Sequence, residues 1–477
     1  MIGAAALALP VAVVLLLLAR LDGGLRRSAA HLPLAAGLAV GTSSLVWWAL
    51  FWVPAPPRAR LWIDLAFWVL ALAAVCRLRT HRVAAAGPPA GRGRWTIRVA
   101  VALFLPLAAL AAARFVSATA VLPHGTWDAW AIWNLRARFL LRGYPGLWHD
   151  GFSALLHWSH PDYPLLVPLS VARGWTCVGM ETTGVPILIS ASFALAAVSA
   201  AAVSVARVRG TARGLLAAAA ILASPAFVEQ ASGQIADVPL GFYMLASFVT
   251  MFNAAAAGPR STWWVLAGLS AGLAAWTKNE GVLFLTVFLA ACAWWSFRSR
   301  GLRGLTGVAL VLSGAAPSLA ALAVLKWGVA APDLLIAGQS AEHVAESLAD
   351  TARIRVAATA LGREMWLGGG QRVGVLPIVA GCLLLSGARR PLGVPGVAAA
   401  AMLVMLFGYV GVYVVTPYDL TWHVSTSVKR VALQLFPTFV WFAFMAARLP
   451  DGGPETGRAS ATLGNFEPDG RPSDAGA

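Results

Sequence analysis

The chain has 477 residues, of which 59% are hydrophobic and 12% are charged, and its mean hydropathy is +0.73. So much apolar surface excludes a water-soluble globular protein of this size, and we expect a lipid bilayer to be its main solvent. The formal net charge of +16 does not indicate a nucleic-acid-binding protein, because most arginines lie in short clusters between apolar segments and form no basic domain.

Repeated apolar segments predict an all-α polytopic membrane protein with about 13 transmembrane helices. Lipid offers the backbone no hydrogen-bond partners, so apolar segments of roughly 17–25 residues are expected to cross the membrane as helices. The predicted spans, in chain order, are residues 1–19, 32–53, 61–77, 98–118, 184–206, 212–228, 235–256, 262–278, 281–297, 303–326, 372–387, 393–416 and 431–447.

The apolar segment 163–180 is interpreted differently, as a juxtamembrane helix. Counted as a span, it would place the basic segment 206–213 outside, against the tendency of Arg and Lys to remain in the cytoplasm. The arginine clusters of the short loops then predict an N-terminus outside and a disordered, cytoplasmic C-terminal tail at 448–477. We expect a multi-pass protein of the plasma (inner) membrane.

Two long loops, 119–164 and 327–371, are expected on the extracytoplasmic face, and loops of this length usually carry function. The predicted organisation is a set of three additional N-terminal helices in 1–97, followed by a membrane domain in 98–447. The active site is therefore expected on the extracytoplasmic face, with the first loop as its main part.

The first loop contains an acidic residue, Asp128, between Trp127 and Trp130 and close to the end of a predicted span. Its position makes it a candidate general base, and the alternative is a helix N-cap, where Asp is favoured. Arg136 and Arg138 follow on the same segment and are candidate ligands of a lipid phosphate. Their alternative role is ordinary interfacial packing of long side chains.

The end of the first loop carries a second polar group in the sequence His160-Pro161-Asp162-Tyr163-Pro164. Asp162 is a candidate second catalytic acid, as is Asp150, and His160 and Tyr163 are candidate substrate-binding residues. A divalent metal held by His157, His160 and an aspartate is an alternative without further support, and we expect no cofactor.

Charged residues recur at the outer ends of later spans. Asp237, Lys278 and Glu280 interrupt apolar sequence, and charges at such positions are usually functional. Ion pairing of Lys278 with Glu280 or Asp237, which would only hold helices together, is the alternative. His423 and Arg430 lie beside the last short outer loop, so the distant charged segments are expected to converge on one face.

These residues resemble the motifs of the GT-C glycosyltransferases, which include protein O-mannosyltransferases and the lipid A aminoarabinose transferase. The resemblance covers about residues 98–447 and rests on four short motifs in the expected order. They are the acid in Thr-Trp-Asp-Ala-Trp at 126–130, the His-Pro segment at 160–164, Ala-Asp-Val-Pro at 236–239 and the lysine that ends a Gly-rich span, Lys278. Where the family has paired acids after its first span, this chain has Asp128 followed by Ala129.

The resemblance implies a membrane glycosyltransferase that moves a sugar from a polyprenyl-phosphate donor to an extracytoplasmic acceptor, which is a glycan, a lipid or a protein. Asp128 would act as the base, inversion would follow from a single displacement, and cations would neutralise the departing phosphate. The partners expected are this donor, the acceptor and membrane lipids, with no nucleic acid. The candidate cations are Arg136, Arg138, Lys278 and Arg430.

Two other functions remain open at this stage. A polytopic transporter or lipid flippase would place charges along a translocation path at mid-span and would be built from inverted repeats, and neither pattern is visible in the sequence. An inactive scaffold that keeps the fold without the chemistry is the second alternative, because the first loop offers a single acid at the expected position.

Overall fold

A computed structural model describes residues 2–22, 29–78, 94–143, 146–332, 339–368, 374–388 and 392–448. Within these residues the fold is all-α, and the only β pairing is an isolated bridge between Ala388 and Ala447. The predicted fold class of a polytopic helical membrane protein is therefore confirmed. The C-terminal tail expected to be disordered lies outside the described residues from 449 onward.

Nine helical stretches of the described residues are long and apolar enough to cross a membrane. Eight of these stretches are single helices, and the ninth, Asn279–Gly328, contains both α13 and α14. The bounds of all these helices are α1 (Ile2–Leu21), α3 (Leu32–Phe51), α4 (Pro57–Arg77), α5 (Arg94–Val121), α8 (Gly184–Arg209), α11 (Asp237–Ala257), α13 (Asn279–Arg300), α14 (Leu305–Gly328), α18 (Gly393–Val414) and α19 (Leu420–Ala446).

The prediction of about 13 spans is higher than the number that the structure shows, although each predicted segment coincides with helix. The helices α12 (Trp263–Ala275) and α17 (Val375–Ser386) have 13 and 12 residues. At 1.5 Å per residue they reach about 20 Å, less than the roughly 30 Å of a bilayer core. The helices α9 (Thr211–Leu222) and α10 (Pro225–Ser232) meet at 67°, and counting them as one span raises the number to ten.

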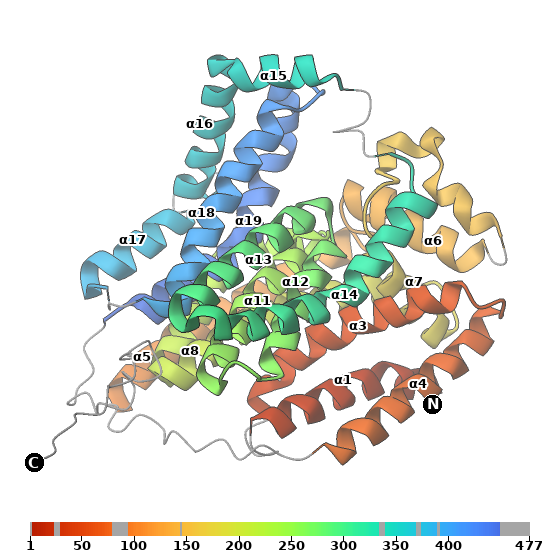
Figure 1. Cartoon of the computed structure of the whole chain (residues 1–477), viewed down its shortest axis with the longest axis horizontal. Helices are drawn as coiled ribbons and strands as arrows, with labels where there is room; N and C mark the ends of the chain where they lie inside the picture. The colour runs from red at the N-terminus through yellow and green to blue at the C-terminus, as the bar shows by residue number, and fades with distance from the viewer. Residues whose placement is uncertain are drawn as a thin grey trace, which may run out of the picture.

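The segment interpreted as a juxtamembrane helix forms α7 (Leu166–Val178), whose 13 residues are also too few to span the bilayer. This helix is buried over most of its length and packs against α1, α3 and the helix α6 (Asn134–Arg142) of the first loop. The second predicted loop is also helical, because α15 (Ala341–Ala349) and α16 (Thr351–Leu367) lie within it. Figure 1 shows α15 and α16 beside α18 and α19, far from the N-terminal helices.

Close packing of α12 against α14 forms the centre of the molecule. Gly268 of α12 lies so near α14 that an added Cβ would stand 1.8 Å from the carbonyl oxygen of Val311. Gly314 of α14 approaches the backbone of α12 in the same way, at 2.0 Å from the carbonyl oxygen of Val265. Small residues allow such close contact between membrane helices, where apolar burial gives little driving force.

Polar contacts gather at two opposite ends of the helices. At one end, Arg207 binds Asp22, and Arg209 donates to the carbonyl oxygen of Met445 at the end of α19. The beginnings of α11, α13 and α19 lie at the other end, together with Lys326 near the end of α14, whose Nζ is 2.9 Å from Oδ1 of Asn279. The arginines 207 and 209, predicted to be cytoplasmic, therefore share one end, opposite the charged residues of the first loop.

Candidate functional site

Asp128 lies at the start of a short helical segment of the first loop. This residue precedes a π-helical turn, η2 (Ala129–Trp133), which continues into α6, and such turns are frequent at functional sites. The Asp128 side chain caps no backbone N–H group, so the structure does not support the helix-cap alternative. Its carboxylate instead accepts a hydrogen bond from Nη1 of Arg430 on α19, 302 residues away in the sequence.

Contacts to the connection between α10 and α11 fix the start of this loop. The backbone N–H of Thr126 donates to the carbonyl oxygen of Gly233 at 3.2 Å. The Gln234 side chain donates from the same connection to the carbonyl oxygen of Pro123 at 3.1 Å. Because the loop is held on both sides of Gly125, which has a positive φ of 76°, the chain turns back and presents Asp128 to α19.

A buried ion-pair group lies beside this pair. Lys278 Nζ is 3.0 Å from Asp237 Oδ1 and 2.8 Å from Glu280 Oε1, so the structure contains both ion pairs that the sequence left as alternatives. Gln434 of α19 donates to Asp237 Oδ1 at 2.5 Å, and its own carbonyl oxygen accepts from the Tyr409 hydroxyl at 2.5 Å. Sequence analysis missed Gln434 and Tyr409, because each lies within an apolar helix without a motif.

Asp162 is held by two further residues, neither of which was assigned to the site from the sequence. Its Oδ2 accepts from Asn279 Nδ2 at 2.6 Å and lies 3.5 Å from Lys326 Nζ. The Asp162 side chain is only 3% exposed, so these contacts occupy a buried carboxylate. Asp162 thus joins the end of the first loop to the start of α13 and the end of α14.

His160 has a left-handed backbone with φ of 50°, which is uncommon for residues other than glycine. Its ring stacks on Tyr163 at 4.6 Å between centroids, and Tyr163 stacks on Trp133 at 5.6 Å. Burial lowers the pKa of His160, against the opposing attraction of the Asp162 and Asp128 carboxylates. The imidazole is therefore neutral at pH 7.

Arg136 stabilises the loop that carries His160. Its guanidinium donates to the carbonyl oxygens of Ser159 at 2.7 Å, of His160 at 3.1 Å and of Gly151. Burial lowers the pKa of Arg136 to about 10, so the group stays protonated at neutral pH. Its donors are used within the loop and do not point to the charged groups of α19.

Arg138 and His423 lie at the edges of the predicted site. Arg138 Nε is 3.5 Å from a Glu181 carboxylate oxygen, and its guanidinium lies 5.4 Å from the Trp175 ring centroid, on the side of α7. His423 contacts the Thr416 hydroxyl at 2.9 Å and lies seven residues before Arg430, on the same face of α19. His423 therefore faces the charged residues, whereas Arg138 does not.

We call the residues that converge here the outer charge cluster: Asp128, Asp162, Asp237, Lys278, Glu280, Lys326 and Arg430. Four carboxylates meet three cations, so the group is nearly balanced in charge. Among the described residues, Arg430 Nε and Asp237 Oδ2 are buried without a hydrogen-bond partner. The cluster therefore retains one donor and one acceptor that no hydrogen bond within the protein uses.

No His, Cys, Asp or Glu side chains of the described residues form a group of three placed to hold a metal ion. Comparison with known proteins gives no relative, because no family model, no curated protein and no solved structure matches the chain. The geometry of the outer charge cluster and the four sequence motifs are therefore the basis for a functional assignment.

Proposed function

We propose that the chain is a membrane glycosyltransferase that moves a sugar from a polyprenyl-phosphate donor to a hydroxyl group of an extracytoplasmic acceptor. The observation that carries the proposal is the pairing of Asp128 with Arg430. Their side chains are 22% and 25% exposed, whereas those of Asp162 and Asp237 are 3% and 1% exposed. The Glu280 side chain is also 20% exposed, but its cation, Lys278, is only 5% exposed. Asp128 is thus the accessible carboxylate of the cluster that is paired with an accessible cation.

The proposed reaction is a single displacement. The Asp128 carboxylate removes the proton of the acceptor hydroxyl, and the hydroxyl oxygen forms a bond to the anomeric carbon of the sugar. The bond between that carbon and the phosphate oxygen breaks, and the lipid phosphate leaves with the electron pair. Arg430 stabilises the new negative charge, for which its Nε is an unused donor. The displacement inverts the configuration of the anomeric carbon.

The remaining cluster residues are assigned positioning roles in this proposal. Asp162 is buried and bonded to Asn279 and Lys326, so we assign it to fixing the first loop and not to a second base. Lys278 lies between Asp237 and Glu280 and neutralises both carboxylates. Burying either acid without this cation would be costly, because unpaired charges are strongly disfavoured in an apolar surrounding.

An aromatic surface next to Asp128 supports an amphipathic donor. Trp127, Trp130 and Trp158 are all between 43% and 47% exposed. Their rings meet edge to face, with the Trp127 centroid 6.0 Å from Trp130 and 6.2 Å from Trp158. Exposed indole rings suit a sugar face or the region between headgroups and acyl chains, and both are present in a lipid-linked sugar.

The catalytic role is tested with Asp128→Asn, assayed in membranes with a radiolabelled polyprenyl-phosphate sugar and extracted acceptors. Loss of a general base is expected to reduce transfer by about 10²–10⁴-fold. The matched control is Asp150→Asn, the same change at an exposed acid of the same loop outside the outer charge cluster. Near-normal transfer by the control and loss in Asp128→Asn would support the proposal.

Equal transfer by Asp128→Asn and the wild type would exclude Asp128 as the base. Absence of transfer in the wild type, together with movement of a labelled polyprenyl-phosphate sugar between the leaflets of proteoliposomes, would favour a flippase. A second variant, Arg430→Lys, keeps the charge but loses the forked guanidinium. It is expected to lower the rate of transfer less than Asp128→Asn does.

A further inference from the structure

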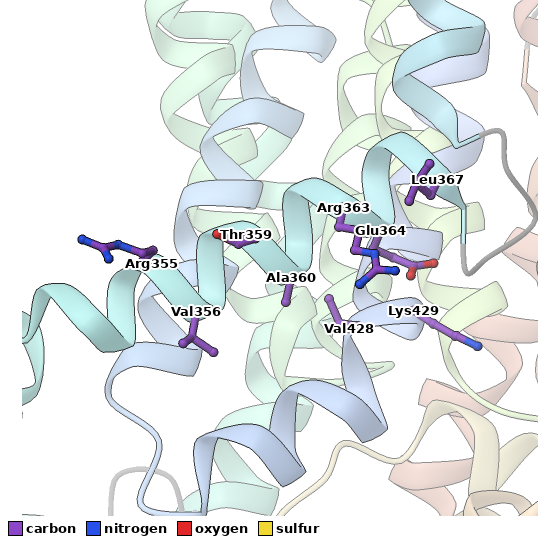
Figure 2. A pocket seen from close by; sticks show the side chains of 9 residues that line it. All are labelled: Arg355, Val356, Thr359, Ala360, Arg363, Glu364, Leu367, Val428 and Lys429. Carbon is purple, nitrogen blue, oxygen red and sulfur yellow. The ribbon is translucent and has the colours of Figure 1, made fainter.

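A groove lies between α16 and α19, on a face of α19 that the proposed reaction does not use. Its volume is about 680 Å³, and Val356, Ala360, Leu367 and Val428 form its apolar walls. Arg355, Arg363 and Lys429 also line it, with Glu364 as the one carboxylate. Figure 2 shows Arg363, Glu364 and Lys429 gathered towards one end and Arg355 towards the other.

The cations of this groove differ from those of the outer charge cluster. Arg355, Arg363 and Lys429 are exposed, and within the described part of the chain none has a hydrogen bond or an ion pair. With three cations and one carboxylate, the groove has a net charge of +2. An excess of positive charge next to apolar walls matches an anion that carries a hydrocarbon chain.

The apolar part of the groove continues along α19. A narrower crevice of about 40 Å³ shares Glu364 and Lys429 with the groove and is lined by Met365, Val375, Leu433 and Phe436. The site therefore has a charged end and an apolar end, in line along one helix. Trp366, on the next position of α16, is 56% exposed, as expected where this helix faces lipid.

We propose that this groove binds an anionic bilayer phospholipid, with the phosphate at Arg363 and Lys429 and one acyl chain at the apolar wall of the groove beside Leu367. Arg355 lies two helical turns from Arg363 and adds to the positive field without contacting the same phosphate. The proposal concerns a lipid of the surrounding membrane, and it does not depend on the proposed transfer reaction.

The geometry of α19 separates this lipid from the reacting groups. Lys429 and Arg430 are consecutive, so their side chains point about 100° apart around the helix. Arg430 faces Asp128, whereas Lys429 lines the groove beside α16. A phosphate bound at Lys429 would therefore lie on a different face of α19 from Asp128, the candidate base. This position suits a lipid that takes no part in the reaction, whereas a reacting donor would have to lie next to Asp128.

The proposal is tested on the purified full-length chain by native mass spectrometry. The delipidated protein is incubated with equal amounts of phosphatidylglycerol and phosphatidylcholine that carry the same acyl chains. We expect phosphatidylglycerol to be retained about tenfold more, and Arg363→Gln/Lys429→Gln to lower its retention about tenfold, because charge-assisted hydrogen bonds are lost.

Two further variants separate the groove from general surface charge and from folding. Arg298→Gln/Arg303→Gln removes the same charge at exposed positions outside the groove and is expected to retain phosphatidylglycerol like the wild type. Ala360→Trp fills the groove without changing the charge and is expected to lose the lipid. It tests the site even if the Arg363→Gln/Lys429→Gln protein does not fold.

Three results would overturn the proposal. The first is equal retention of the two phospholipids by the wild type. The second is an equal loss of phosphatidylglycerol in the groove variant and the Arg298→Gln/Arg303→Gln control. The third result has two parts: a short-chain polyprenyl phosphate displaces phosphatidylglycerol, and the groove variants lose sugar transfer. Together these observations would identify the groove as the donor site. The first two results rest on lipid retention alone and are independent of the Asp128→Asn outcome, whereas the third also requires sugar transfer by the wild type.

Discussion

His160 shows how one residue links the first loop to the outer charge cluster. Its left-handed backbone places the ring against Tyr163, and its carbonyl oxygen accepts from Arg136. The sequence suggested a metal ligand or a substrate-binding residue at this position. The structure shows a half-buried, stacked imidazole at a strained turn, and such strain is often found at functional sites.

The lowered pKa of His160 predicts a pH-dependent loop. In the unfolded chain the histidine titrates near its usual pKa of about 6.5, whereas in the folded protein it resists protonation. The unfolded state therefore binds more protons as the pH falls from 7 to 5.5, and the stability of the loop decreases in that range. Hydrogen exchange of segment 153–165, corrected for intrinsic rates, should show faster opening at pH 5.5.

His160→Asn is the control for this effect. Asparagine tolerates a left-handed backbone but does not titrate, so the difference between pH 7 and pH 5.5 should disappear. The carboxylates and cations that face His160 are Asp162, Asp128, Lys278 and Arg430. If the pH dependence of exchange is unchanged in His160→Asn, it arises from these carboxylates and cations and not from His160.

At the scale of the elements, a buried ion pair joins the N-terminal helices to the rest of the protein. Arg173 of α7 donates to Asp64 of α4 at 2.7 Å and to the carbonyl oxygen of Ala6 in α1 at 2.7 Å. The Asp64 side chain is fully buried and also accepts from the Trp68 indole at 3.2 Å. The three N-terminal helices, predicted as an addition to the membrane domain, are thus held to the rest of the protein by α7.

Breaking this pair should destabilise the protein more than removing it completely. Arg173→Met leaves the Asp64 carboxylate buried without its cation and is expected to cost about 3–5 kcal/mol of the free energy of unfolding. Arg173→Met/Asp64→Leu removes both charges and should recover most of that loss. Thermal unfolding in detergent measures the difference, and equal melting temperatures of the single and double variants would contradict the argument.

At the scale of the whole molecule, the outer charge cluster combines the first loop with the ends of four helices. Asp128 and Asp162 come from the loop, Asp237 from α11, Glu280 from α13, Lys326 from α14 and Arg430 from α19. The predicted convergence of distant charged segments is confirmed for Asp128, Asp237, Lys278, Glu280 and Arg430. The face of the membrane on which they meet stays a prediction from the arginine clusters.

Cysteine labelling tests that orientation in a background whose native cysteines are replaced by alanine. Asp150→Cys lies in the first loop and Arg298→Cys near the end of α13, and both positions are exposed. A membrane-impermeant maleimide should label intact cells at position 150 and should reach position 298 only after permeabilisation. The reverse pattern would invert the predicted topology.

Sequence alone determined the fold class, the position of nearly every helix and the first loop as the place to search. These features follow from local hydrophobicity, because a bilayer requires an apolar segment to be a helix wherever it occurs. The predicted number of about 13 spans is not shown by the described residues, because apolar length in the sequence does not reveal where a helix ends or bends. The short helices α12 and α17 and the bend between α9 and α10 depend on their packing partners.

Only the tertiary structure decided which side chains meet. Asp128 and Arg430 are 302 residues apart, and no local pattern relates them. Gln434, Tyr409 and Lys326 have no motif, so their contacts with the cluster were not predictable from the sequence. Arg136, predicted to bind a lipid phosphate, instead donates to backbone carbonyl oxygens of its own loop. A guanidinium binds whichever acceptors the fold places around it, and the sequence does not specify these acceptors.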